Sequence, residues 1–438
     1  MIARSEAASY LVRYRSGTES QSRSLQWESD LTVDGRGFRQ HLAEAMPPEA
    51  SDLLILAASA YAVDRMVARP GLRRTRDSGD WHRDLFMDVP VSDPSRWAAL
   101  AAKTERLLRW LTDDNWNLHF SQRAGYRGPL DPSQQALFSA LPARCRPILF
   151  SGGLDSGCAL QNALSVDDAV AISVHTNSWM QNTQRTVAQG LASLSTHRLA
   201  ALSFRVNLPA GGTETSQRTR GLLFLASGTM AAIAAGADGL VVAENGVGAI
   251  NLPYVASQRG TESTRAMHPR TLHMFSDIVS SLRGTEFTVD APYLMSTKAE
   301  LIGMTNAVAD KALSHTVSCD SGFSARVAHR EPCGRCTSCI LRRQSLAAAG
   351  RPMVDERLPY RHPIPVEFPE FSAMAWQVLR LRRCLREPDP WPQLMCEFPE
   401  LVHLDGLLDQ GRVLSLYDRY VQEFETYLQS LGIEQQWM

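Results

Sequence analysis

Residues 150–160 have the sequence FSGGLDSGCAL and directly follow the apolar residues Ile148 and Leu149. Two adjacent glycines, Gly152 and Gly153, interrupt this stretch before an aspartate and a second serine. Glycine weakens both helices and strands because it loses more backbone freedom on folding than other residues do. A pair of glycines between an apolar run and a helical pattern therefore indicates a loop whose backbone has a special task.

The segment around this loop, from about 146 to 310, alternates between strand-like and helix-like patterns. The strand-like runs are PILF at 147–150, DAVAISVH at 168–175, LAALSFRVN at 199–207 and DGLVVAE at 238–244. Helical patterns lie between them, at 157–165, 183–194 and 221–236. Such alternation predicts an α/β fold with a parallel sheet and right-handed connections. Ligands of such sheets bind beyond the carboxyl ends of the strands, where the loop is expected.

The loop has the composition of a phosphate-binding site. We expect the strand to end at Phe150 and a helix to begin near Ser156, so that backbone amides point at a bound phosphate and the helix dipole favours its charge. Asp155 would orient the loop or carry a Mg²⁺ ion bound to the nucleotide. The alternative is a glycine-rich turn with an Asp or Ser helix cap. The predicted nucleotide-binding residues are Ser151, Gly152, Gly153, Leu154, Asp155 and Ser156.

Four cysteines have the spacing of a metal site. Cys333, Cys336 and Cys339 form C-x2-C-x2-C, and Cys319 lies upstream. Four thiolates suit tetrahedral Zn²⁺, and Gly334 permits the tight turn between the first two ligands. The alternatives are free thiols or a redox pair, although a redox pair needs only two cysteines. The remaining cysteines are scattered and are interpreted as small hydrophobic residues: Cys145, Cys158, Cys384 and Cys396.

The string SGGLDS resembles the SGGxDS signature of the PP-loop ATP pyrophosphatases. Together with the cysteine motif it resembles the QueC family, the 7-cyano-7-deazaguanine synthases, over about 146–350. The stretch 221–246 and the segment APYLMSTKAELIG at 291–303 are also similar to that family, with Lys298 and Glu300 in matching places. Arg342 stands where the family has an arginine after the last zinc ligand.

The resemblance implies a PP-loop α/β core, ATP, Mg²⁺ and Zn²⁺ as cofactors, and Asp155, Lys298 and Arg342 as catalytic residues. It also implies a reaction in which ATP adenylates the carboxylate of 7-carboxy-7-deazaguanine. Ammonia then attacks the acyl group, and a second activation dehydrates the amide to the nitrile.

The chain departs from the QueC pattern in ways that resemble the enlarged QueC-like proteins of anti-phage defence systems, the Qat type in particular. It has long flanking regions, it keeps Arg220 without the family's asparagine, and it lacks a clear acidic residue for base recognition. Glu244, Asn245 and Glu262 are the candidates for that role. The defence resemblance implies partner proteins of the same operon and a deazaguanine joined to a partner's amine.

The flanking regions suggest three domains. Strand-like SYLVRYR and DLFMDVPV and helical patterns at 52–67 and 96–111 predict an α+β domain at 1–145, with a loop at 68–80 and a linker at 124–133. The QueC-like domain would span 146–350, and 351–438 would hold a proline-rich linker at 359–371 followed by short helices. The last helical pattern has an apolar stripe, interpreted either as packed on its own domain or as docking a partner: Leu414, Tyr417, Val421, Phe424 and Leu428.

Composition excludes some functions. With 45 basic and 46 acidic residues, the chain lacks the basic excess of a duplex-DNA binder. No signal peptide is recognisable, and the longest apolar run, 221–236, is too short to span a bilayer, so we expect a cytoplasmic protein. Other functions left open are a conventional 7-cyano-7-deazaguanine synthase, a tRNA thiolase and an inactive scaffold that keeps the nucleotide pocket.

Overall fold

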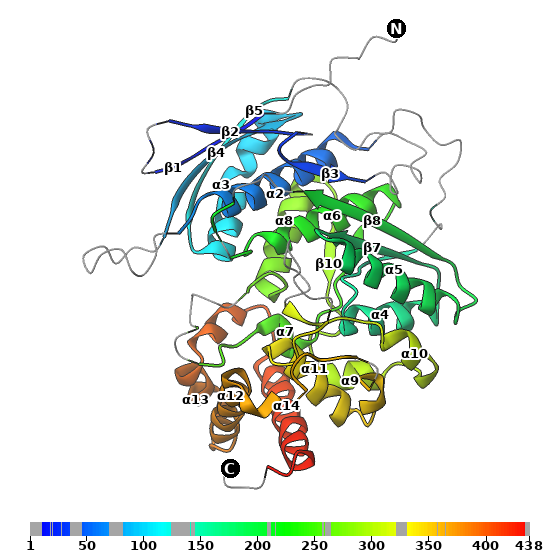
Figure 1. Cartoon of the computed structure of the whole chain (residues 1–438). Coiled ribbons are helices and arrows are strands. Elements are labelled where there is room, and N and C mark those ends of the chain that lie inside the picture. Colours follow the sequence, from blue (N-terminus) through cyan, green and yellow to red (C-terminus); the bar gives the residue numbers. More distant parts are fainter. Residues whose placement is uncertain are drawn as a thin grey trace. The chain divides into compact units, whose positions relative to one another are not determined.

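The computed structural model describes residues 11–17, 19, 21–27, 29–35, 46–69, 82–123, 141, 145–207, 212–214, 216–255, 258, 264–320, 331–356, 358–363 and 365–433. The fold is α/β with two sheets (Figure 1). The linker expected at 124–133 lies outside the described residues, as does most of the loop expected at 68–80.

The chain forms two compact units, each assembled from separate stretches of sequence. The first comprises 1–147, 202–240 and 271–289, and the second comprises 148–201, 241–270 and 290–438. The sequence-based domain boundaries near 145 and 350 remain predictions.

A four-stranded sheet lies within the first unit, in the order β2-β1-β4-β5. Strand β1 is antiparallel to β2 and β4, whereas β4 runs parallel to β5 with Asp84 opposite Asn115. The strands predicted from SYLVRYR and DLFMDVPV are confirmed, but β2 and β5 were missed because each buries few of its residues. The strand bounds are β1 Leu11–Ser16, β2 Arg23–Gln26, β4 Asp84–Val91 and β5 Asn115–Gln122.

Two helices, α2 and α3, accompany this sheet and occur where apolar residues repeat at helical spacing. Helix α2 (Pro48–Met66) is buried along most of its length, and α3 (Pro94–Thr112) buries one face. Both carry proline at the start, which suits the first helical turn. Asp93 caps α3 by accepting a hydrogen bond from the Arg96 amide at 3.0 Å.

The second sheet has six strands in the order β10-β9-β6-β7-β8-β3 and is largely parallel. Strand β9 runs parallel to β6, with Val241 opposite Ile148, whereas the edge strand β3 is antiparallel to β8. The four predicted strands are all present, and the two edge strands β3 and β10 were not foreseen. The bounds are β3 Thr32–Asp34, β6 Arg146–Leu149, β7 Ala169–His175, β8 Leu199–Asn207, β9 Gly239–Val241 and β10 Thr288–Asp290.

The remaining helices follow the predicted α/β rhythm and then continue to the C-terminus. The α-helices are α4 Leu154–Leu164, α5 Ser178–Ala192, α6 Arg220–Ala234, α7 Gly246–Ile250, α8 Pro269–Arg283, α9 Lys298–Gly303, α10 Asp310–Leu313, α11 Thr337–Ala348, α12 Pro369–Leu385, α13 Pro390–Glu397 and α14 Gln410–Ser430. Short 3₁₀ helices are η2 Ala307–Ala309, η4 Pro352–Val354, η5 Pro365–Glu367 and η6 Pro399–Leu404.

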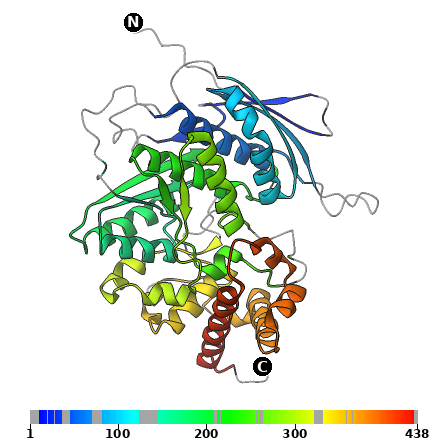
Figure 2. The ribbon, with the colours of Figure 1, turned by 180° about the vertical axis from the view of Figure 1, so that it is seen from behind.

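The C-terminal helices α12, α13 and α14 share one hydrophobic core with parts of α7 and α11, and both views draw them together (Figures 1 and 2). Four residues of the predicted stripe are buried in this core and the fifth, Leu414, packs against it. Packing on its own unit is therefore confirmed, and the alternative of a free docking stripe is wrong for these residues. The linker interpretation of 359–371 is also partly wrong, because η5 forms inside it and Pro369 opens α12.

Helix length and polarity also bear on membrane insertion. Among the described residues, no helix combines the length and the apolar character that crossing a bilayer requires.

Candidate functional site

The glycine loop connects β6 to α4, as predicted, although α4 begins at Leu154 and not near Ser156. Gly152 has φ 82°, a left-handed conformation that favours glycine, and a Cβ there would lie 3.0 Å from the Gln184 side chain. Gly153 is the N-cap residue, so the cap position itself has no side chain. The Asp or Ser cap of the alternative interpretation is therefore wrong, whereas phosphate binding by the loop stays a prediction.

Neighbouring segments fix this loop from two sides. Gln184 on α5 donates to the Ser151 carbonyl at 3.2 Å. On the other side, the Val317 amide donates to the Gly152 carbonyl at 3.0 Å. The Leu154 amide, at the start of α4, donates to the Ser318 hydroxyl at 3.3 Å. Sequence reasoning missed Gln184 and Ser318, because both come from distant segments and belong to no short motif.

Hydroxyl groups surround the amides that would face a phosphate. The Gly153 amide donates to the Ser151 hydroxyl at 3.2 Å, and the Ser151 and Ser156 hydroxyl oxygens lie 3.1 Å apart. Ser156 also donates to the Gly153 carbonyl at 3.0 Å. Amides at a helix start together with rotatable hydroxyls form a donor set that fits a phosphate group.

Asp155 is the centre of a buried polar cluster. It is 8% exposed, one carboxylate oxygen pairs with the Lys298 ammonium, and the other accepts from the Asn245 side-chain amide at 2.7 Å. Asn245 also caps α7 by accepting from the Gly248 amide at 3.0 Å. Both Asp155 oxygens are thus engaged by Lys298 and Asn245, and its predicted roles in orienting the loop or carrying Mg²⁺ stay predictions.

Lys298 occupies the first residue of α9, where Thr297 and Glu300 form a capping box. It is 8% exposed although it carries a charge, and a buried charge requires a partner such as Asp155. The chain contains only three lysines, Lys103, Lys298 and Lys311, among 45 basic residues. The structure thus brings Lys298 to the start of α4, beside the predicted phosphate loop.

Glu244 is a partly buried carboxylate near this cluster. Burial and the nearby Asp155 charge raise the pKa of Glu244 to about 7, and Lys298 opposes the shift. Of the three base-recognition candidates, Asn245 is committed to Asp155 and to its cap, and Glu262 lies outside the described residues. Of the two described candidates, Glu244 is therefore the one with acceptor capacity to offer a ligand.

Arg342 lies on α11 and is 1% exposed. Its guanidinium donates to Asp355 and to the Thr316 hydroxyl, both at 2.7 Å, and Asp355 also accepts from Tyr360 at 2.8 Å. These bonds join α11 to the segment that leads to Cys319. The catalytic role implied for Arg342 stays a prediction.

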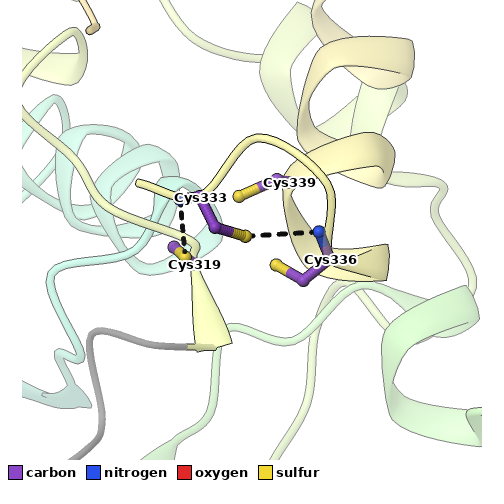
Figure 3. A group of neighbouring side chains, drawn as sticks. All are labelled: Cys319, Cys333, Cys336 and Cys339. Atoms are coloured by element: carbon purple, nitrogen blue, oxygen red, sulfur yellow. Dashed lines mark hydrogen bonds between the residues drawn. The ribbon is translucent and has the colours of Figure 1, made fainter. Parts of the chain in front are cut away.

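The four predicted ligand cysteines come together, as Figure 3 shows, with their sulfur atoms facing a common space. All four sulfurs lie within 4.8 Å of one another. The Cys319 sulfur accepts from the Cys333 amide at 3.2 Å, and the Cys333 sulfur accepts from the Cys336 amide at 3.3 Å. Such amide bonds favour thiolates, and Gly334 at φ 81° provides the turn between them.

The protonation of the cluster also fits a dication. Thiol hydrogen bonds from the other three cysteines lower the pKa of Cys319, whereas bonds with Cys319 raise the pKa of Cys336 and of Cys339. A hydrogen bond with Cys319 raises the pKa of Cys333, but bonds with Cys336 and Cys339 outweigh it and lower that pKa to about 6, so both Cys319 and Cys333 favour the thiolate form. A tetrahedral Zn²⁺ would satisfy all four sulfurs, so the residues fit this ion. Of the other cysteines, Cys145, Cys158 and Cys384 are buried as expected, but Cys396 is exposed.

Comparison with known proteins gives one family match. The model of the family described as "Queuosine biosynthesis protein QueC" matches residues 263–350. Over these residues the chain resembles QueC. The QueC-like segment includes Lys298, Arg342 and the four cysteines, whereas the glycine loop lies outside it. The match covers 88 of the 438 residues and shows a QueC-like segment. No curated protein matches the chain.

Proposed function

We propose that this protein uses ATP to adenylate the carboxylate of 7-carboxy-7-deazaguanine, or a close analogue, and passes the acyl group to an amine. The observation that supports this proposal most strongly is the pairing of the Gly152–Gly153 loop at the start of α4 with Lys298, fixed beside it by Asp155. The QueC family match supports the deazaguanine substrate class.

The proposed chemistry proceeds in two steps. A carboxylate oxygen of the substrate attacks the α-phosphorus of ATP, a new O–P bond forms, and pyrophosphate leaves. The amine nitrogen then attacks the acyl carbon, AMP leaves with the carboxylate oxygen, and the amine loses a proton. Adenylation is needed because a free carboxylate is a poor electrophile.

Each residue has a role that its geometry supports. The loop amides and the Ser151 and Ser156 hydroxyls would bind phosphate oxygens, and a preorganised donor of this kind contributes roughly 3–4 kcal/mol to transition-state stabilisation. Lys298 would add positive charge next to them. Asp155 orients Lys298, and Glu244 would accept hydrogen bonds from the N–H groups of the deazaguanine. The cysteine cluster, with Zn²⁺ bound, would be a structural element of the fold.

We further propose that the amine belongs to a partner protein, most simply its N-terminus, and that the protein acts in an anti-phage defence system. Support comes from the length of the chain, since the QueC-like match covers 263–350 of 438 residues. An amine delivered by a bound protein would reach the activated acyl group at high effective concentration. The α14 stripe gives no support, because it is buried.

Product analysis tests this proposal. The enzyme, ATP and 7-carboxy-7-deazaguanine are incubated with ammonia, and separately with proteins encoded beside it, and products are analysed by mass spectrometry. We expect a partner protein to gain the mass of the acyl group, and we expect acetylation of its N-terminus to prevent the gain. Free 7-cyano-7-deazaguanine, formed equally with and without partners, would identify a conventional synthase instead.

A further inference from the structure

The C-terminal helix α14 contacts the residues next to both partners of Asp155. At one end, Thr297 precedes Lys298 and donates its hydroxyl to Glu423 of α14. At the other, a Cβ on Gly246, the residue after Asn245, would clash with Leu416 of α14. Helix α14 packs along α11 and α7 within the second unit (Figure 1).

Further bonds tie α14 to the turn that leads into α9. Arg419 pairs with Glu300 of the capping box at 2.7 Å and donates to the Met295 carbonyl at 2.8 Å. Glu300 accepts from the Thr297 amide at 2.8 Å, so Arg419 and Glu423 hold the same capping box from two sides. A helix cap of this kind fixes where the first residue of its helix points.

The segments that carry the two partners of Asp155 are also joined. The Gly246 amide donates to the Ser296 carbonyl at 2.9 Å, which links the start of α7 to the residues before α9. A side chain at position 246 would not fit, because the Leu294 carbonyl and Leu416 occupy that space. The start of α7, the start of α9 and α14 therefore form one packed unit around Lys298 and Asn245.

From these contacts we infer that α14 is a positioning element for the Asp155 cluster: Glu423, through Thr297, holds Lys298 against Asp155. According to this inference, helix α14, which lies beyond the QueC-like match, stabilises the arrangement of the Asp155 cluster. The expected effect of Glu423 on catalysis rests on the proposed function, whereas its effect on the position of Lys298 does not. Glu423 is a positioning residue, since it acts through the cap and not on a ligand.

The lysine content of the chain allows a direct test. Acetic anhydride labels accessible lysines, and the three lysines can be quantified separately by peptide mass spectrometry. In the wild-type protein, Lys298 should react slowly because it is buried and paired, whereas Lys103 and Lys311 are more accessible and serve as internal references. In Glu423→Ala, Lys298 labelling should rise about tenfold or more, because the cap loses its acceptor and opens more often.

Matched variants separate positioning from general loss of structure. Glu423→Gln keeps an oxygen that accepts the Thr297 hydroxyl, so it should restore slow Lys298 labelling. Asp418→Ala removes an exposed carboxylate from the same helix and should leave labelling unchanged. If Glu423→Ala does not fold, Thr297→Val removes the bond to Glu423 together with the cap bond from the Glu300 amide, so Lys298 labelling should rise at least as much.

The outcomes keep the inference and the proposed function apart. Unchanged Lys298 labelling in folded Glu423→Ala, or in folded Thr297→Val, would overturn the inference whatever the activity. Increased labelling that is specific to Lys298 supports the inference. If the wild-type protein releases no pyrophosphate, that result overturns only the proposed function. Where the wild type is active, Glu423→Ala should lower kcat and Glu423→Gln should restore it.

Discussion

The Leu154 amide donates to the Ser318 hydroxyl at 3.3 Å, and Ser318 directly precedes Cys319, a member of the four-cysteine cluster. One residue earlier, the Val317 amide donates to the Gly152 carbonyl at 3.0 Å. The segment that closes the glycine loop is thus anchored at its end by a cysteine of the candidate metal centre. The loop at 151–156 and the cysteines of the cluster are at least 163 residues apart in the sequence, and this segment joins them in the fold.

Removing the metal should therefore loosen the glycine loop. We expect a chelator that strips the metal to increase amide hydrogen exchange in peptides covering 151–156, because Val317 and Ser318 lose their anchor. Peptides from α3 serve as the control and should exchange as before. Unchanged exchange at 151–156, with metal loss verified by elemental analysis, would show that the loop does not depend on the cluster.

Replacing one ligand should remove the metal itself. Cys336→Ser should lose bound zinc and become unstable, because structural zinc contributes on the order of 10 kcal/mol or more in small zinc-binding peptides. Cys396→Ser, which changes an exposed cysteine outside the cluster, should keep full zinc content. Elemental analysis of both purified variants checks this, and normal zinc in Cys336→Ser would refute the ligand assignment.

A side chain at the helix start should block the phosphate site. Gly153→Val introduces a branched side chain beside the loop amides, and ATP affinity, measured by calorimetry, should fall by about a hundredfold or more. The control is Gly303→Val, since a Cβ at Gly303 meets no atom within 4 Å. Unaltered ATP affinity in a folded Gly153→Val protein would mean that ATP binds elsewhere.

The raised pKa of Glu244 predicts that the stability of the fold depends on pH. Since burial raises the pKa of Glu244 to about 7, the folded state prefers the protonated acid, and the resulting stabilisation is lost as pH rises through 7. Glu244→Gln cannot ionise, so its free energy of unfolding should exceed that of wild type by roughly 1–3 kcal/mol at pH 8 and match it near pH 4. Denaturant unfolding at both pH values measures this difference.

Two comparisons keep that measurement specific. Burial also raises the pKa of Glu423 to about 7, so the wild-type trend contains a contribution from both carboxyls, and only the difference between variant and wild type isolates Glu244. Glu387→Gln, on an exposed residue, should show no such difference. A Glu244→Gln difference that does not grow with pH would contradict the buried-acid assignment.

The local parts of the site were predictable from sequence, whereas its supports were not. Short stretches of sequence contain the C-x2-C-x2-C spacing and the strand-to-helix setting of Gly152 and Gly153. These features are predictable because residues close together in the sequence form the metal-binding turn and the loop. Ser318, Gln184 and Glu423 act on the loop or on α9 from remote segments, and a serine, glutamine or glutamate has no pattern that reveals such a partner. The buried α14 stripe illustrates the same limit, since apolar spacing predicts a helix face but not what covers it.

Exchange of labelled pyrophosphate into ATP that depends on 7-carboxy-7-deazaguanine measures the adenylation step. This assay does not require the amine acceptor. Wild-type protein with 7-carboxy-7-deazaguanine and Mg²⁺ should catalyse this exchange, and Gly153→Val should reduce it by about a hundredfold or more. If the folded, zinc-loaded wild-type protein shows no exchange above the level without the acid, the loop and Lys298 do not serve carboxylate adenylation.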